Sequence, residues 1–479
     1  MLFSENSPIL REALLSELPA EWPHDLSAEI RRHTQAAGRK LVVLDDDPTG
    51  TQTVHDVWVL TQWTPQALRP ALGDDNPLFY ILTNSRSLPE QEAVALNREI
   101  ATNLATVSRE LGCDFDVISR SDSTLRGHFP AEINALQTTL EPYFNRRFDG
   151  ILICPFFLEG HRVTAADIHW VAEEDRLTPA ALTEFARDVT FGYTQSNLRK
   201  WVEEKTRGQV PAAAVISLSL DVIRSQGPKG VYHVLRRLKH GQIGVINALT
   251  YRDLSVVVAG LLRAEADGQR FLFRTAASFV KVRGAVGDRD LLAPDELVGP
   301  GLTGGLVVVG SYVQKSTRQL QRALELPELV SVELRVQRIL DPATRREEIG
   351  RVAQTANQAL QNNQEAIVFT SRDLETPKGR AGDLDIGERV SSALVEMIRR
   401  IQVSPRFIIA KGGITASDIA THGLNVQRAR VMGQILPGVP VWRLEAESRY
   451  PGLSYVIFPG NVGTDDSLAD TIRILRTRP

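Results

Sequence analysis

The sequence predicts an α/β protein of two domains, each built on a largely parallel sheet. Its 479 residues exceed the length that one hydrophobic core usually supports. Short apolar runs alternate with amphipathic helical patterns in both halves, which is typical of parallel sheets. A glycine-, proline- and acid-rich segment at 284–305 separates the halves. With this fold class we expect the active site in the cleft between the two domains.

The first half divides into an extension and a domain. Residues 1–40 show helical apolar spacing without a strand, so we expect an N-terminal extension there and a first domain over 41–290. A helix is predicted between Ser87 and Gly112, with a capping box from Ser87 to Glu90 and a left-handed end at Gly112. Strands are predicted in apolar runs that begin at residues 41, 56, 78, 115, 150, 212, 243 and 271.

The second domain is expected over 300–479. Its strands are predicted in apolar runs that begin at residues 304, 330, 366, 406 and 454. Ligands of parallel sheets collect beyond the carboxyl ends of the strands, where loops and helix N-termini supply backbone donors. We therefore look for chemistry in the residues that follow each strand.

Composition excludes several classes of protein. A net charge of −3, from 55 basic and 58 acidic residues, gives no basic surface for nucleic acid. Two cysteines without metal-ligand spacing indicate neither a disulfide framework nor a cysteine metal site. No apolar run approaches the ~18 residues of a membrane span, and the N-terminus lacks a signal-peptide pattern. We expect a cytoplasmic protein without a membrane partner, for which a homodimer is possible.

Charged residues gather after four strands of the first half. Arginines suit a ligand carboxylate because the guanidinium fork holds two oxygens, and aspartates suit the removal of a hydroxyl proton. One such residue alone is more often a helix cap, a turn residue or a solvated side chain, but four clusters with both charge signs favour a site. The clusters contain Asp45, Asp46, Asp47, Arg86, Arg120, Asp122, Arg126, His128, His161 and Arg162.

Glycine–hydroxyl turns follow strands of the second half, at 310–317, 411–418 and 459–467. Such turns cradle phosphates with backbone N–H groups, although each alone also serves a tight turn. No P-loop and no G-x-G-x-x-G fingerprint is present. Asp465 and Asp466 either hold Mg²⁺ or cap the following helix, and Lys411 either contributes charge to nucleotide phosphates or reaches solvent.

Four motifs resemble those of the four-carbon acid sugar kinases. They are DDPTG (46–50), RSDSTLRGH (120–128), GGIT (412–415) and PGNVGTDD (459–466), and the match spans about residues 41 to 470. The resemblance implies an N-terminal domain that binds a sugar acid and a C-terminal domain that binds ATP. It implies ATP-dependent phosphorylation, with Mg²⁺, of the terminal hydroxyl of acids such as D-threonate, D-erythronate or 3-oxo-tetronate.

The resemblance and the chemistry of the strand ends together assign roles to residues. We expect Asp46 or Asp47 to act as the base, and Asp465 and Asp466 to bind the metal. The expected substrate residues are Thr49, Gly50, Arg86, Arg120, Asp122, Arg126 and His161. The expected nucleotide residues are Ser311, Lys411, Gly412, Gly413, Thr415, Gly460, Asn461 and Gly463. The sequence departs from the family at Pro48, where a bulky apolar residue is common, and in its long N-terminal extension.

Two other classes are weighed against a kinase. A sugar-acid dehydrogenase predicts a dinucleotide fingerprint, which the sequence lacks. A catalytically inactive binding or interaction protein of the same fold predicts decay of the polar strand ends, whereas acids, arginines and glycine turns survive in both halves.

Overall fold

The chain divides into two compact α/β units in the computed structural model, which describes residues 5–297, 303–372 and 380–476. The first unit comprises Met1–Asp46 and Gln62–Asp288. The second comprises Asp47–Thr61 and Arg289–Pro479, so a short early segment belongs to the later unit. The chain therefore passes from one unit to the other within the Asp-rich stretch, between Asp46 and Asp47.

The first unit is built on a parallel sheet with strand order β4-β2-β5-β12-β6-β11-β10. Most residues of the central strands are buried, in keeping with a parallel sheet that helices cover on both faces. The strands are β2 (Arg39–Asp45), β4 (Leu78–Leu82), β5 (Asp114–Arg120), β6 (Gly150–Cys154), β10 (Ile216–Leu218), β11 (Gln242–Ile246) and β12 (Phe271–Thr275).

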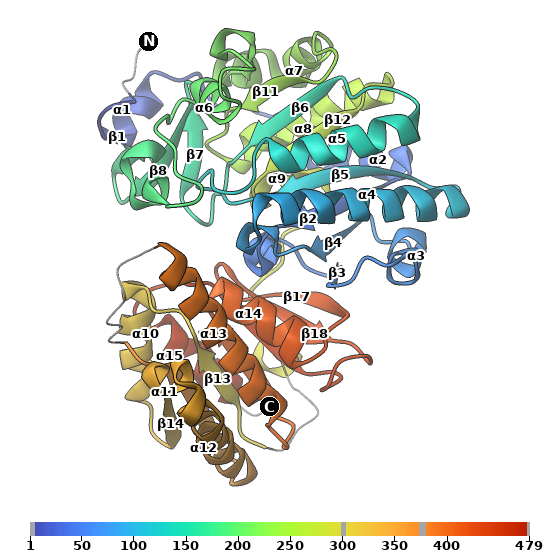
Figure 1. Ribbon diagram of the computed structural model, residues 1–479. Coiled ribbons are helices and arrows are strands. Elements are labelled where there is room, and N and C mark those ends of the chain that lie inside the picture. Colours follow the sequence, from blue (N-terminus) through green and yellow to red (C-terminus); the bar gives the residue numbers. More distant parts are fainter. Residues whose placement is uncertain (1–4, 298–302, 373–379, 477–479) are drawn as a thin grey trace. The chain divides into compact units, whose positions relative to one another are not determined.

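Helices pack on both faces of this sheet (Figure 1). One row contains α3 (Pro65–Gly73), α4 (Glu90–Leu111) and α5 (Ala131–Phe144). The other contains α2 (Ser27–Ala37), α7 (Gly227–Leu235), α8 (Tyr251–Ala266) and α9 (Ala277–Arg283). This is the doubly wound arrangement that βαβ connections produce.

A small antiparallel sheet accompanies the large one in the first unit. Its strand order is β1-β9-β8-β7, with β1 (Ile9–Leu10), β7 (Arg162–Ala165), β8 (Ile168–Glu173) and β9 (Arg176–Pro179). The pairing of β1 with β9 attaches the N-terminal segment to this sheet. The short helices are α1 (Arg11–Ser16), α6 (Leu198–Lys205), η2 (Ser85–Ser87), η3 (Ala180–Leu182), η4 (Glu184–Arg187), η5 (Ala212–Ala214) and the π-helical η6 (Val222–Gln226).

The second unit has a mixed sheet with strand order β3-β17-β18-β19-β16-β13-β15-β14. The strands from β19 to β14 are parallel, and β3, β17 and β18 form an antiparallel end. The strands are β3 (Val57–Leu60), β13 (Leu306–Val309), β14 (Leu329–Leu334), β15 (Glu365–Thr370), β16 (Phe407–Lys411), β17 (Arg428–Leu436), β18 (Val439–Leu444) and β19 (Ser454–Phe458).

Helices also flank the second sheet. The longer ones include α10 (Gln314–Leu324), which packs with α15 (Ser467–Arg476), and α12 (Pro342–Gln361), which packs with α13 (Arg380–Arg399). The others are α11 (Val336–Leu340), α14 (Gly413–Asp418), the π-helical η8 (Ile419–Gly423) and the 3₁₀ helices η1 (Pro48–Thr53) and η7 (Pro294–Leu297). The core contains apolar residues of β13, β16, β19 and α15.

The predicted α/β class is confirmed, and two local predictions differ. Helix α4 begins at Glu90 with Pro89 before it and without a side-chain cap, so the capping box is wrong, while Gly112 ends the helix in the predicted left-handed conformation. The strand predicted from 271 ends at Thr275 and gives way to α9. The hairpin of β17 and β18 and the small sheet were not predicted.

Strand order locates the ligand sites of both sheets. In the first unit, β4 lies on one side of β2, and β5, β12 and β6 follow on the other side of β2. In the second unit, β15 and β14 lie on one side of β13, and β16 lies on the other side of β13. Open α/β sheets bind ligands at such reversals, beyond the carboxyl ends of the two strands. The loops after β2, β5, β13 and β16 are therefore the candidate site loops.

Candidate functional site

The end of β2 carries a buried ion pair in the first unit. The parallel register places Asp45 beside Arg120 of β5, and Arg120 Nη1 lies 2.9 Å from Asp45 Oδ1 and 3.5 Å from Asp46 Oδ1. All three side chains are buried. Because a buried charge needs a partner, Arg120 is balanced by acids of the protein itself. Asp45, to which the family motifs assign no role, is thus the main partner of Arg120, a predicted substrate residue.

Asp122 is the centre of a second charged cluster in the first unit. Arg126 Nε lies 2.8 Å and Arg86 Nη1 3.4 Å from the Asp122 carboxylate, and Arg126 also lies 3.7 Å from Asp188. Burial alone would raise the pKa of Asp122, but the two guanidinium groups lower it far below its usual range. Asp122 therefore stays ionised at neutral pH, and the structure brings together three of the residues predicted for substrate binding.

Glu132 is a buried acid near the same strand ends. Its Oε1 accepts hydrogen bonds from Ser85 Oγ at 2.5 Å and from Asn97 Nδ2 at 3.3 Å. Burial raises the pKa of Glu132 to about 7, and the charge of Asp46 acts in the same direction. A carboxyl group that titrates near neutrality beside a candidate base is a signal of a functional site. The sequence analysis did not select this residue.

Asp47 and Pro48 begin η1 in the second unit. Asp47 Oδ1 accepts a hydrogen bond from the Thr49 backbone N–H at 2.8 Å, and the Gly50 N–H donates to the Asp47 carbonyl oxygen at 3.1 Å. Proline suits the first position of a helix, where its fixed φ is already helical and no N–H is required. Pro48 therefore has a local structural reason, and Thr49 and Gly50 shape the turn.

Gly413 lies against the Asp47 carboxylate. A Cβ atom at Gly413 would come within 2.7 Å of Asp47 Oδ2, which is closer than real contacts allow. The glycine thus permits the predicted base Asp47 and the first residue of α14 to approach each other within the second unit.

The loops after β13, β16 and β19 meet around Ser311. Ser316 Oγ donates to Ser311 Oγ at 3.0 Å and to the Gly460 carbonyl oxygen at 3.2 Å. A Cβ atom at Gly412 would lie 3.1 Å from Ser311 Cβ, and one at Gly460 would lie 3.3 Å from Ser311 Oγ. Thr415 Oγ1 lies in the same place, 3.3 Å from the Gly412 position. The predicted glycine turns therefore form one cluster.

Lys411 is fully buried, so the interpretation as a solvent-reaching lysine is wrong. Its Nζ donates to the carbonyl oxygens of Pro459 at 2.7 Å and Gly460 at 3.4 Å. Burial, together with the nearby positive charges of Lys315 and Arg372, lowers the pKa of Lys411 to about 7. Lys411 thus fastens the loop after β19 at the end of β16.

Arg372 is a cation of this cluster that the sequence analysis missed. It follows β15, and its Nη1 donates to the Ser311 carbonyl oxygen while its Nη2 donates to that of Val309 at 3.4 Å. Burial lowers the pKa of Arg372 to about 10. Lys315 Nζ reaches the Asn461 carbonyl oxygen at 3.4 Å. The sequence does contain a signal for Arg372, because the strand predicted from residue 366 ends in the polar residues Thr370, Ser371 and Arg372.

Asp465 and Asp466 point toward helix α10. Arg318 Nε lies 3.0 Å from Asp465 Oδ1, and Arg322 Nε lies 2.8 Å from Asp466 Oδ1. The loop before them is held by Gln319, whose Nε2 donates to two backbone carbonyl oxygens, and Gly463 has a φ of 84°. Among the described side chains, which exclude those of 380–385, no group of three His, Cys, Asp or Glu residues is arranged to hold a metal ion.

The histidines of the first unit have different surroundings. His161 is exposed in a left-handed turn before β7, and no hydrogen bond of its ring occurs among the described residues. His128 Nε2 lies 2.9 Å from the Leu88 carbonyl oxygen, which fits a structural role. Beside His161, Arg162 begins β7 and stacks 5.3 Å from the Phe185 ring, the ring that Arg126 also approaches.

Two family models match this chain. A sugar-binding N-terminal domain matches residues 41–283, which include the clusters around Asp45 and Asp122. A nucleotide-binding C-terminal domain matches residues 306–468, which include the glycine turns around Ser311. The chain belongs to the four-carbon acid sugar kinase family. The resemblance inferred from the four motifs is thereby confirmed.

Solved structures share the fold of this family member. A Salmonella typhimurium LT2 protein with a provisional tRNA synthase name is 17% identical, with a TM-score of 0.66 over 91% of this chain and 98% of its own. Haemophilus influenzae protein HI1011, a DUF1537 protein, is 17% identical, with a TM-score of 0.61 over 90% of this chain and 99% of its own. No curated protein matches the sequence.

A third solved structure is a DUF1537 protein of Bordetella bronchiseptica, a domain-swapped dimer with bound citrate. It is 19% identical over 91% of this chain and 100% of its own. Its TM-score is 0.37.

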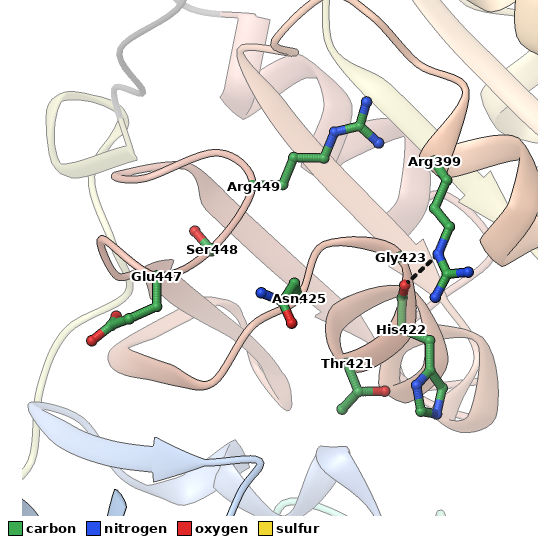
Figure 2. A pocket seen from close by; sticks show the side chains of 8 residues that line it. All are labelled: Arg399, Thr421, His422, Gly423, Asn425, Glu447, Ser448 and Arg449. Carbon is green, nitrogen blue, oxygen red and sulfur yellow. Dashed lines mark hydrogen bonds between the residues drawn. The ribbon is translucent and has the colours of Figure 1, made fainter.

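A surface pocket of about 530 Å³ lies elsewhere in the second unit, and none of the predicted site residues lines it (Figure 2). Its arginines already bind backbone oxygens: Arg399 Nε donates to His422 at 2.8 Å, and Arg449 Nη1 donates to Ile398 at 2.9 Å. The pocket is therefore not the candidate site of this family member.

Within the described residues, no helix is both long enough and apolar enough to cross a membrane.

Proposed function

We propose that this chain transfers the γ-phosphoryl group of ATP to the terminal hydroxyl of a four-carbon sugar acid. The observation that carries the proposal is the group of cations around Ser311, in the region matched as nucleotide-binding. Lys315, Arg372 and Lys411 form no ion pair with a carboxylate among the described residues. Phosphoryl transfer depends on positioning and on neutralising phosphate charge, so such cations are suited to nucleotide phosphates.

The acceptor hydroxyl requires a base, and the two candidates are Asp46 and Asp47. Asp46 lies among the buried charges of the sugar-binding domain, close to Arg120. Asp47 lies at the start of η1 against Gly413. Either carboxylate would orient the hydroxyl and accept its proton, which typically contributes a factor of about 10² to 10⁴ in rate.

Mg²⁺ is part of the proposal. Mg²⁺ prefers oxygen ligands and is usually held by one or two carboxylates together with substrate phosphates and water. Asp465 and Asp466 supply such oxygens, and their ion pairs with Arg318 and Arg322 are half exposed, so opening them costs little. These two carboxylates thus fit an ion that the nucleotide would help to hold, where it would neutralise phosphate charge.

Coupled ADP release tests the reaction. Wild type, Asp46→Asn and Asp47→Asn are assayed with Mg²⁺-ATP against D-threonate, D-erythronate and 3-oxo-tetronate, with ATP alone as the background. We expect acid-dependent ADP formation in the wild type and a loss of about 10²-fold or more in the variant that lacks the base. Undiminished turnover in both variants would remove these aspartates from the base role.

Thermal-shift measurements address the rival dehydrogenase. We expect ATP and ADP, but not NAD, to raise the melting temperature, because ligands stabilise the state that binds them. Stabilisation by NAD alone would contradict the kinase proposal.

A cytoplasmic location and a homodimer also stay predictions, and light scattering of the purified protein tests the dimer.

A further inference from the structure

Strand register places an arginine of β12 beside Asp46, one of the two candidate bases. Ser119 of β5 is in register with Leu44 of β2 on one side and with Arg274 of β12 on the other. Side chains two residues apart along a strand point to the same face. Asp46 and Ser121 therefore continue on the face that carries Arg274, whereas Asp45 and Arg120 point to the opposite face.

Gly127 marks the place where these side chains converge. A Cβ atom built on Gly127 would lie 3.4 Å from Asp46 Oδ2, 3.4 Å from Ser121 Oγ and 3.5 Å from Arg274 Nη2. Gly127 has a φ of 118°, a conformation that other residues rarely adopt. Because Gly127 has no side chain, a carboxylate, a hydroxyl and a guanidinium group come together beside its backbone.

Arg274 is a buried cation that no acid balances directly. It is 3% exposed and forms no ion pair with a described residue, and its one hydrogen bond runs from Nη2 to the Arg126 carbonyl oxygen at 3.0 Å. Its guanidinium stacks against Trp201 at 5.1 Å and Phe129 at 5.5 Å. Burial lowers the pKa of Arg274, and the more distant Asp46 and Glu132 offset this only in part. Such a group is costly to keep without an anion.

Ser121 adds a second polar group without a protein partner. Its Oγ is buried and makes no hydrogen bond among the described residues, although buried hydroxyls are normally paired. By contrast, the arginines that the sequence selected for the substrate carboxylate are already paired. Arg120 lies against Asp45, and Arg86 and Arg126 lie against Asp122.

We propose that Arg274 binds the carboxylate of the sugar acid, with Ser121 as a hydrogen-bonding partner of the same ligand beside Gly127. The inference rests on the proposed function for its substrate class, and it identifies the residue that recognises the acid group. A hydroxy acid fits this set because it offers an anion for Arg274 and hydroxyls for Ser121 and Asp46. Arg86, Arg120 and Arg126 then hold acids of the protein in place.

Calorimetric titration without nucleotide tests this assignment. The probes are D-erythronate and D-threonate, each compared with its neutral carboxamide, and the proteins are wild type and Arg274→Gln. We expect the wild type to bind at least one acid about 10- to 100-fold more tightly than its amide, which corresponds to a charge-assisted hydrogen bond. In Arg274→Gln this preference should fall to within about threefold.

Arg270→Gln is the matched control. Arg270 immediately precedes the same strand, is also buried and also stacks on an aromatic ring, Phe144, but it is paired with Asp114 and Asp116. This control should lower the melting temperature and keep the acid-to-amide preference. Ser121→Ala provides a second variant that should fold normally, because its hydroxyl has no protein partner, and it should weaken acid binding several-fold.

The outcomes separate this inference from the kinase proposal. If Arg274→Gln still prefers the acid over the amide, the assignment of Arg274 is overturned. If Arg274→Gln fails to fold, unchanged acid binding in Ser121→Ala would overturn the assignment instead. Equal binding of acid and amide by the wild type would overturn it too. Arg274-dependent binding without ADP formation would uphold the inference and contradict the kinase. Failure of the wild type to bind either acid would overturn the inference, whereas ADP formation with 3-oxo-tetronate would still support the kinase.

Discussion

Asp46 and Asp47 are neighbours in the sequence, yet their side chains have different surroundings. Asp46 lies near Arg120 and near Gly127, in the first unit. Asp47 caps η1 and contacts the backbone at Gly413, in the second unit. Substitution of each residue by asparagine therefore perturbs a different set of contacts, so the two variants report on different surfaces.

Glu132 gives a prediction about stability and pH. Its pKa is about 7 in the folded protein and 4.5 in an ordinary glutamate, so between these pH values the folded state binds more protons than the unfolded state. The free energy of unfolding must then fall as pH rises through this window. Glu132→Gln stays neutral, so we expect it to lose less stability than wild type between pH 5 and pH 8, by about 2 kcal/mol.

Urea unfolding at pH 5, 6, 7 and 8 measures this difference. Glu265 also has a pKa raised by burial to about 7, but it is present in both proteins, so its contribution cancels in the comparison. Parallel stability profiles for wild type and Glu132→Gln would show that Glu132 is ionised normally in the folded protein.

At the scale of elements, the contact between η1 and α14 gives a second prediction. A Cβ atom at Gly413 would overlap the Asp47 carboxylate, so Gly413→Ala should displace η1 or α14. Forcing an extra carbon into a packed contact typically costs about 1 to 3 kcal/mol. We expect a lower melting temperature and, under the proposed function, a reduced kcat.

Gly350→Ala is the control for this substitution. Gly350 lies within helix α12, where a Cβ atom would meet only the end of the flexible Arg400 side chain at 3.4 Å. Alanine favours a helix interior over glycine by about 1 kcal/mol, so this variant should keep or gain stability. If both variants behave alike, the tight contact at Asp47 has no energetic weight.

Elements with strong apolar signals could be predicted from the sequence, and those with mixed patterns could not. The runs at 41, 78 and 150 form strands whose two faces are both buried, which gives an unbroken apolar signal. Strand β17 alternates buried and half-buried positions, and its arginines and glutamine dilute the apolar signal. The small sheet of β7, β8 and β9 consists of strands of four to six residues, too short for a clear period.

The sequence predicts which loops form the candidate site, but it does not predict the role of each residue in them. Residue type and position after a strand located the loops that contain Asp45, Asp122, Ser311 and Gly412. Which side chains pair with one another depends on the register of the strands and on residues that other strands contribute, and the sequence shows neither. Arg274 was missed for this reason, because it lies inside an apolar strand run and its neighbours come from β2 and β5.

At the scale of the whole molecule, the second unit depends on an early segment of the chain. Strand β3 pairs with β17, Trp442 Nε1 donates to Thr51 Oγ1 at 3.1 Å, and Gln52 Nε2 donates to the Gly438 carbonyl oxygen at 3.2 Å. A fragment of residues 289–479 lacks these partners and exposes the edge of β17. We expect it to aggregate or to unfold without cooperativity.

A second fragment tests whether the missing segment is responsible. Residues 47–61 joined to residues 289–479 by a flexible glycine–serine linker should restore a cooperative thermal transition, measured by circular dichroism. The linker alone, attached to residues 289–479, is the control. Cooperative unfolding of the shorter fragment at the same temperature would show that η1 and β3 contribute little.

The division of the second unit also has a consequence during synthesis. Residues 47–61 leave the ribosome about 230 residues before the rest of their unit, because Gln62–Asp288 lies in between. At roughly 5 to 20 residues per second, the apolar strand β3 must wait more than about ten seconds for β17. During this interval Val57, Val59 and Leu60, all buried in the finished fold, lack their native neighbours. The nascent chain is therefore expected to recruit chaperones at this strand until translation supplies its partner.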